Sequence, residues 1–258
     1  MEKNLTRRGF LGAGAILGGA ALGSCLLAER SVSARAKGAD WPFPYKPLPD
    51  LKAVEKRGYD SGSTGGCMFG AFDAIIGPLA DKYGEPYSSF PSKMMAYGAG
   101  GIGGFRTVCG ALNGAAAAFG LFVESNKARN AMIQELFLWY EKTPLPIMRV
   151  GKPVHNLPMP RSVARSTLCH ISVARWCAQT GYKVKTPAHA ERCHRLVGDV
   201  ARKGAEILNQ HASGRFAPTL ALSADLVACM ECHGPGTELA NSISKMECDV
   251  CHGDPHPE

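Results

Sequence analysis

Apolar residues recur every three or four positions in several stretches of the chain, which is the spacing of a helix face buried against a core. The stretches that show it are Met68–Tyr83, Ser125–Lys142, Ser162–Gln179 and the run from Pro187 to Asn209. Thr186 followed by Pro187 is the N-cap and first-turn pair that opens the last of them. No segment alternates apolar and polar residues convincingly over the length of a strand, so the sequence predicts a mainly α fold.

Proline and glycine mark the segments between these stretches. Trp41–Pro49 is rich in proline, and we expect an extended arm there because proline interrupts helices and central strands. Ser61–Cys67 holds several glycines and serines, which predicts a flexible lead-in to the helix that follows. Within that helix, Gly77-Pro78 is a potential kink.

A third glycine-rich segment, Tyr97–Phe105, lies before the cysteine at position 109. Gly98–Gly103 matches the Gly-x-Gly-x-x-Gly motif of dinucleotide sites, but no strand-like run precedes it, which argues against such a site. We expect the glycines instead to let the backbone approach a bulky cofactor or a neighbouring helix closely.

The last thirty residues hold the most specific pattern in the chain. Cys229–His233 and Cys248–His252 each spell Cys-x-x-Cys-His, the attachment sequence of a c-type haem. Two thiols two residues apart bond to one edge of the porphyrin, and the adjacent imidazole binds the iron. A zinc ribbon would use the cysteine pairs but leave two identically placed histidines unexplained. The predicted attachment residues are Cys229, Cys232, Cys248 and Cys251, and the predicted proximal iron ligands are His233 and His252.

The two predicted haems are expected to be close neighbours. Gly234–Glu247 joins the motifs and spans at most ~47 Å when fully extended. Its glycine and proline residues favour turns, which shorten that reach.

The N-terminus predicts export. Thr6–Leu11 contains a twin-arginine pair before an apolar run to Ala28, and Ala34–Ala36 offers a cleavage site. We therefore expect a signal peptide over residues 1–36, a periplasmic mature protein and no permanent membrane span. Lipidation at Cys25 is the alternative, and it would anchor the chain to a membrane surface.

Composition limits the remaining choices. The mature chain of about 222 residues is enough for one substantial domain, and 45% of all residues are hydrophobic. The predicted division is a helical domain over residues 37–220 and a dihaem-binding segment over residues 221–258. The formal charge of +7 falls to nearer +4 without the leader, and no basic run with interleaved aromatics is present, so no nucleic-acid partner is expected.

Five cysteines remain after the leader and the haem motifs are set aside: Cys67, Cys109, Cys169, Cys177 and Cys193. Two disulfides and one free thiol would be compatible with an oxidising compartment. Four thiolates on an iron–sulfur cluster are the alternative. The twin-arginine route carries folded chains, so it favours a cofactor that is inserted before export.

The haem pair, Gly66-Cys67, the segment Cys109–Gly114 and the helices that carry Cys177 and Cys193 together resemble the split-Soret cytochromes c. More broadly, they resemble the family named for a Cys-x-Gly-Cys-Ala-x-x-Gly motif with later cysteines. The resemblance covers nearly all of the mature chain.

This resemblance implies a mainly helical, homodimeric, periplasmic protein. Its four haems would gather at one end of the dimer, stacked within each subunit and with two histidines on each iron. It also implies an iron–sulfur centre, here expected to be [2Fe–2S]. Thr64 replaces the first cysteine of the motif and Met68 its alanine, so the implied cluster ligands are Cys109, Cys177 and Cys193, with Cys67, or alternatively Cys169, as the fourth.

The sixth ligand of each haem is expected to be a histidine, as is usual for low-potential carriers. His155 in its proline-rich loop and His170 beside Cys169 are the predicted distal ligands, followed by His211. Filled iron positions would make the protein, as a homodimer, an electron carrier that exchanges single electrons with redox partners that the sequence does not identify. An open haem or cluster position would instead make it a redox enzyme for a small substrate. No nucleophile–base pair points to hydrolysis or group transfer.

Overall fold

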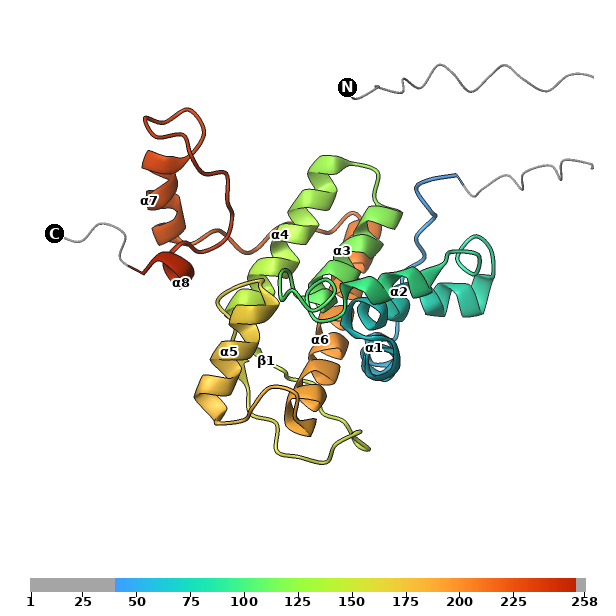
Figure 1. The fold of residues 1–258 in the computed structure, drawn as a ribbon. Helices are drawn as coiled ribbons and strands as arrows, with labels where there is room; N and C mark the ends of the chain where they lie inside the picture. Colours follow the sequence, from blue (N-terminus) through green and yellow to red (C-terminus); the bar gives the residue numbers. More distant parts are fainter. Residues whose placement is uncertain (1–39, 254–258) are drawn as a thin grey trace, which may run out of the picture. The chain divides into compact units, whose positions relative to one another are not determined.

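The computed structural model describes residues 40–253 of the 258-residue chain. The predicted signal peptide, Cys25 and His256 lie outside the described residues. The described part belongs to one unit, Ala39–Glu258, and its regular secondary structure is almost entirely helical (Figure 1). A mainly α, single-domain fold is therefore confirmed. The predicted boundary at residue 220 stays a prediction.

The helices follow one another through most of the chain. In order they are α1 (Leu51–Gly65), α2 (Cys67–Tyr83), the 3-10 helix η1 (Ser92–Gly98), α3 (Gly110–Phe122), α4 (Asn126–Lys142), α5 (Cys169–Thr180), α6 (Pro187–Ala212), α7 (Ala224–His233) and α8 (Asp249–His252). Two short strands, β1 (Pro144–Leu145) and β2 (Ser162–Val163), form an antiparallel pair between α4 and α5.

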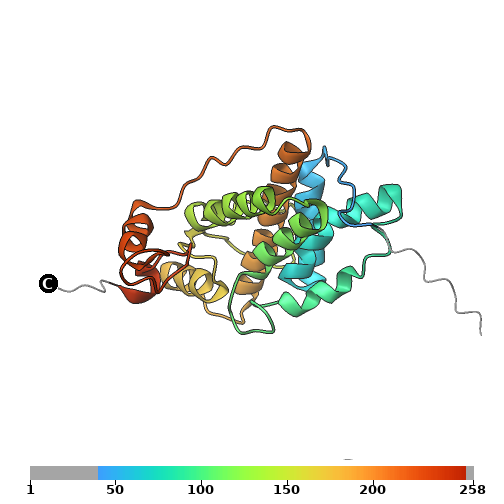
Figure 2. The same cartoon turned by 90° about the horizontal axis from the view of Figure 1, so that it is seen from above.

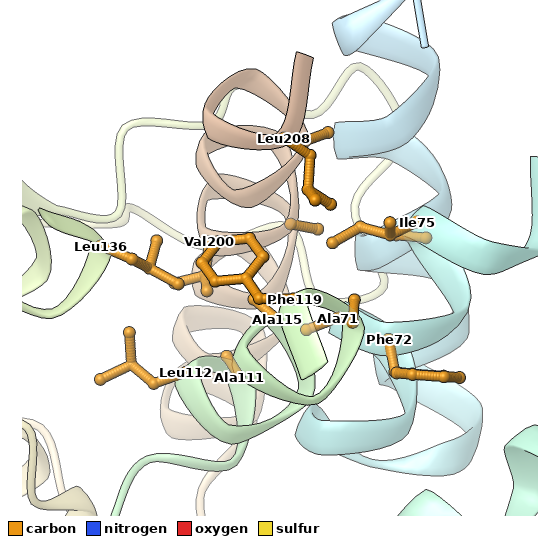
Figure 3. Close-up of a cluster of buried hydrophobic side chains, with 14 of the residues drawn as sticks. Ala71, Phe72, Ile75, Ala111, Leu112, Ala115, Phe119, Leu136, Val200 and Leu208 are labelled. Atoms are coloured by element: carbon orange, nitrogen blue, oxygen red, sulfur yellow. The ribbon is translucent and has the colours of Figure 1, made fainter. Parts of the chain in front are cut away.

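The core forms where α1, α2, α3 and α6 pack together, with α4 alongside (Figures 1 and 3). Small residues of α2 and α3 alternate with large ones, so the helices lie close while the large side chains fill the gaps. Figure 3 shows Ala71, Phe72 and Ile75 from α2, Ala111, Leu112, Ala115 and Phe119 from α3, Leu136 from α4, and Val200 and Leu208 from α6. All are at most 1% exposed.

Glycines bring α1 and α2 together. A Cβ atom at Gly70 would lie 2.5 Å from the backbone of Gly62, a distance that packed proteins do not tolerate. Replacing Gly70 by alanine is therefore expected to lower the free energy of unfolding by about 1–3 kcal/mol, through overpacking.

Gly120→Ala is the matched control, because a Cβ at this α3 position meets no atom within 4 Å. Alanine is the better helix former by up to about 1 kcal/mol, so this variant is expected to be as stable as the parent or slightly more so. Urea denaturation of both variants provides the comparison. Equal stability of the two would show that the α1–α2 contact is looser than described.

Two sequence-based boundaries were wrong. The expected flexible lead-in Ser61–Cys67 is mostly helical, since α1 continues to Gly65. Asp50 is the N-cap of this helix, and its carboxylate accepts hydrogen bonds from the amides of Lys52 and Ala53 at 3.0 Å. The helix expected from Ser162 begins only at Cys169, because Ser162 pairs with Leu145 in the strand ladder. Helix α2 also runs continuously through Pro78.

The segment Trp41–Pro49 is extended, as predicted, and packs on its own chain. The Trp41 indole donates to the Gly120 carbonyl at 2.9 Å, and the Tyr45 hydroxyl donates to the Asn209 side chain at 2.9 Å. The arm is thereby held against α3 and α6.

After α6 the chain passes along α4 before α7 begins (Figure 2). Glu135 of α4 fixes this linker, because its carboxylate accepts hydrogen bonds from the amides of Thr219 and Leu220 at 2.9 and 3.0 Å. Lys245, between α7 and α8, donates to Gln134 at 2.9 Å. Within residues 40–253, no helix has both the length and the apolar character that crossing a bilayer requires.

Candidate redox centres

Four of the five non-haem cysteines border one cavity of about 200 Å³. They come from four different helices: Cys67 is the first residue of α2, Cys109 is the N-cap of α3, Cys169 is the first residue of α5, and Cys193 lies in α6. Gly110 permits this approach, because a Cβ there would lie 2.3 Å from the Cys67 sulfur. The close approach expected of the segment Tyr97–Phe105 occurs at Gly98, where a Cβ would lie 2.1 Å from the Met68 sulfur of α2.

The starts of α2, α3 and α5 therefore meet at this cavity. The first amides of a helix have no partner within the helix and carry the positive end of its dipole, so three such ends favour negative charge. At Cys109, the amides of Ala111 and Leu112 act in this direction on the thiol pKa. The local sequence thus places sulfur where helix geometry stabilises a thiolate.

Burial favours the protonated form of three of these thiols, those of Cys67, Cys109 and Cys169. Burial, followed by the neighbouring Cys109, raises the pKa of Cys67 to about 12. Burial likewise raises the pKa values of Cys109 and Cys169. Metal binding must therefore release thiol protons, and affinity for the metal is expected to rise with pH.

Three residues that line the same cavity each have a buried side-chain nitrogen without a hydrogen-bond partner. Arg192 is buried, and its Nε makes no hydrogen bond; the same is true of His189 Nε2 and His194 Nδ1. Because buried polar atoms are normally satisfied, three such atoms around one cavity indicate an occupant that accepts hydrogen bonds and carries negative charge. A thiolate-bound iron–sulfur cluster fits both requirements.

A single metal ion fits less well. Within the part of the chain that the structure describes, no three His, Cys, Asp or Glu side chains are grouped closely enough to hold one ion. Four thiols around a wider cavity suit a group of several atoms that reaches each sulfur.

The two Cys-x-x-Cys-His motifs border a second cavity, of about 360 Å³. Cys229 and His233 of α7 face it, as do Cys248 and His252 at α8, and the thiols of Cys229 and Cys248 interact. The two motifs therefore lie close together, and the proximity of the two haems stays a prediction. His233 Nδ1 lies 2.9 Å from the Asn241 side-chain oxygen. A tautomer that donates from Nδ1 carries its lone pair on Nε2, the nitrogen suited to bind iron.

Comparison with known proteins identifies the family. Residues 69–207 match the family model described as "Putative redox-active protein (C_GCAxxG_C_C)". A relative from Desulfovibrio desulfuricans (strain ATCC 27774 / DSM 6949 / MB), the split-Soret cytochrome c, is 40% identical over 257 residues, which cover 92% of this chain and 91% of the relative. This chain belongs to the split-Soret cytochrome c family.

A solved structure of the split-Soret cytochrome c from Desulfovibrio desulfuricans ATCC 27774, described as having a novel iron centre, superposes with a TM-score of 0.75 at 40% identity. The match covers 82% of this chain and 90% of that one. The family resemblance inferred from the sequence is confirmed.

Within this member of the split-Soret family, the fold brings together three of the four predicted cluster ligands, Cys67, Cys109 and Cys193. Cys177 does not border the cavity, although its thiol lies near Arg192 and Cys193. The lining also includes Cys169, the predicted alternative to Cys67. The cavity therefore favours Cys169 over Cys177.

The predicted distal histidines do not border the haem-motif cavity. His155 lies in a loop against α1 and α6, where its amide donates to Glu191 at 3.1 Å and the Val154 amide donates to Tyr59 at 2.7 Å. His170 is exposed at the start of α5. Their role as iron ligands stays a prediction.

Sequence reasoning missed Arg192 and assigned no role at the cluster to His189 or His194. The spacing of these residues could have indicated the site. His189 lies three residues before Arg192 and four before Cys193, so one face of α6 carries all three. A helix face with these side chains would suit an anion if it bordered a cavity, and only the structure shows that it does.

Proposed function

We propose that this chain is an exported c-type cytochrome that binds two haems and carries single electrons, with a [2Fe–2S] cluster as a second redox centre. The observation that carries the proposal is the presence of two separate sulfur-lined cavities. One is bordered by both haem-attachment motifs, and the other by four further thiols beside the buried Arg192 and two histidine nitrogens that lack hydrogen-bond partners. The iron centre described for the Desulfovibrio relative supports the second part.

In the first cavity the chain's own residues have distinct roles. Cys229, Cys232, Cys248 and Cys251 would hold two porphyrins covalently, and His233 and His252 would bind the irons. Haem supplies one-electron chemistry when it is bound. Asn241 holds the His233 ring in the orientation that its hydrogen bond sets, which fixes the proximal ligand before iron binds.

In the second cavity, Cys67, Cys109, Cys169 and Cys193 would hold the cluster, and the helix starts would stabilise the thiolates. Burial of Cys109 and Cys169 limits access of water to the sulfur atoms. A dry, preorganised environment of this kind suits outer-sphere electron transfer.

Two imidazoles on each haem iron would leave no position for a substrate, so the protein would act as a carrier. His155 and His170 remain our candidates for the distal side. Unchanged spectra after addition of carbon monoxide to the reduced protein would agree with a carrier. A five-coordinate fraction that binds carbon monoxide would indicate a redox enzyme instead.

The proposal includes periplasmic location through the twin-arginine signal, and a homodimer that exchanges electrons with other redox proteins. Exposed apolar side chains on the haem-binding segment support an assembly that covers them. Ile243 is 87% exposed and Leu239 52%. Exposure of such side chains to water is unfavourable, and a second subunit or the haems would remove it.

The mature protein is expected to carry two covalent haems and additional iron with acid-labile sulfide. Mass measurement under denaturing conditions detects the haems, because thioether bonds survive denaturation. Iron and sulfide analysis of the native protein detects the second centre. A bare polypeptide mass would exclude the cytochrome, whereas haem iron alone, without sulfide, would exclude the cluster.

A further inference from the structure

Arg192 is a buried cation without an acidic partner. Its side chain is 2% exposed, and no carboxylate in residues 40–253 lies within ion-pair distance of it. One end of its guanidinium donates to the Ser172 hydroxyl at 2.7 Å and to the Ser172 carbonyl at 3.3 Å. The other terminal nitrogen, Nη1, lies 3.9 Å from the Cys193 sulfur, and Nε has no hydrogen-bond partner.

This position would be strongly unfavourable in an empty cavity. A buried charge without a counter-charge is strongly destabilising, and arginine is almost never buried unless it is paired. Trp176 offsets part of this cost, because the guanidinium carbon lies 5.7 Å from its ring centroid. The remaining compensation must come from the cavity, where Cys109 and Cys193 interact electrostatically with Arg192.

His189 adds a neutral donor on the same side. Its Nδ1 accepts a hydrogen bond from the Lys185 amide at 3.3 Å, so the ring proton sits on Nε2. That nitrogen is buried, borders the cavity and has no partner. A sulfur atom of the cluster would accept a hydrogen bond from this N–H group.

We propose that Arg192 is the positioning residue that supplies the counter-charge of the iron centre and raises its reduction potential, with His189 as a supporting hydrogen-bond donor. This inference rests on the proposed function of the cavity. Reduction adds one negative charge to the centre, and a cation held nearby in a medium of low dielectric stabilises the reduced form more than the oxidised form. Charge and hydrogen bonds to sulfur are the means by which proteins tune such potentials.

The first test compares Arg192→Met with Arg192→Lys in the haem-containing protein. Methionine keeps much of the volume but removes the charge, and lysine keeps the charge. The methionine variant is expected to lower the equilibrium constant for reducing the centre at least tenfold relative to the haems of the same molecule, about 59 mV for one electron. The lysine variant is expected to recover most of that shift.

Arg202→Met is the matched control, because Arg202 lies on the same helix but is solvent-exposed and pairs with Glu55 at 3.5 Å. It is expected to leave the potential unchanged. Potentials are measured by redox titration, with electron paramagnetic resonance for the cluster and visible absorption for the haems. An unchanged potential in Arg192→Met with its centre intact would overturn the proposal, as would equal shifts in the methionine and lysine variants.

The second test uses protein that cannot assemble the centre, through Cys109→Ser. In that background Arg192→Met is expected to raise the denaturation midpoint, because it removes an uncompensated buried charge. In protein with the centre, the same change is expected to lower the midpoint. A decrease of equal size in both backgrounds would mean that Arg192 contributes packing alone, and the proposal would fail.

Failure of the proposed function has a different signature. It is seen in the parent protein, as haem iron without additional iron or sulfide, before any Arg192 variant is made. That result would also overturn the role of Arg192 as counter-charge, because there would be no centre for it to act on. The two failures are therefore distinguished by the composition of the parent protein, which needs no variant.

Discussion

Replacing Cys169 by serine is expected to remove the non-haem iron and sulfide from the purified protein, whereas replacing Cys177 is expected to leave both in place. Cys169 is the first residue of α5, is 8% exposed and borders the thiol-lined cavity, where it interacts with Cys109 and Cys193. Cys177 lies eight residues further along the same helix and does not border the cavity. A hydroxyl is a poor ligand for a cluster that thiolates bind, so loss of one ligand is expected to reduce occupancy at least tenfold.

The two haems supply an internal standard for this comparison. Their attachment depends on the separate motifs at α7 and α8, so haem content is expected to be the same in both variants and in the parent. Iron and sulfide per haem are then compared directly, with Cys109→Ser as the positive control for loss. Loss of the centre in Cys177→Ser, with retention in Cys169→Ser, would support the ligand set inferred from the family resemblance against the one that the cavity favours.

Sequence alone could predict the haem motifs because their chemistry is local. Covalent attachment and iron ligation are encoded in five consecutive residues, and no tertiary context is needed to recognise them. The long helices α4 and α6 were predictable for a similar reason, since the apolar residues that α4 and α6 bury recur at helical spacing.

Helix α1 was missed because its packing depends on glycine. Gly58 and Gly62 lower helix propensity, yet they let α1 lie against α6, where added Cβ atoms would approach Ala201 and Val197 at 3.0 Å. A pattern that indicates flexibility in a single sequence here indicates close contact between helices. Only the tertiary structure distinguishes these two meanings.

The sequence pattern also could not show that Cys169 borders the cavity while Cys177 does not. Both lie on one helix, and its periodicity does not say which end adjoins another element. The answer depends on where α5 begins, and that is set by the pairing of Val108 with Leu168 just before it. A two-residue contact between distant segments thus decides which thiol borders the cavity.

The second large effect concerns pH and stability. Replacing Glu141 by glutamine is expected to stabilise the protein at pH 8 and to have little effect at pH 5. Glu141 of α4 is 4% exposed, and its Oε1 makes no hydrogen bond. Burial, followed by the nearby Glu247 carboxylate, raises the pKa of Glu141 from 4.5 to about 7. The Thr167 amide and Lys142 act in the opposite direction but do not cancel the shift.

The sign follows from the raised pKa. Below pH 4.5 the carboxyl is protonated in both the folded and the unfolded states, so its contribution to stability is fully present. As pH rises toward 7, the unfolded state loses this proton more readily, and the contribution is lost. A pKa raised from 4.5 to about 7 corresponds to about 3 kcal/mol of stability. Because glutamine is neutral at every pH, the variant is expected to gain up to about 3 kcal/mol over the parent at pH 8.

Glu135→Gln on the same helix is the matched control, and its expected effect has the opposite sign. Burial alone would raise the Glu135 pKa, but the hydrogen bonds from the Thr219 hydroxyl and from the Leu220 and Thr219 amides outweigh it, and the pKa is lowered. The charged form is therefore the stabilising one, and removing it is expected to destabilise the protein at pH 8 and progressively less below pH 4.5.

Urea denaturation of parent and variants at several pH values provides the measurement. The difference between each variant and the parent is the decisive quantity, because His189 and His194 have lowered pKa values and change the parent's own curve in the opposite direction to Glu141. Glu141 borders a cavity with Lys245 and Met246 of the haem-binding segment, so its ionisation acts where that segment meets α4. A Glu141→Gln variant no more stable than the parent at pH 8 would mean that water or Lys245 already compensates the carboxylate.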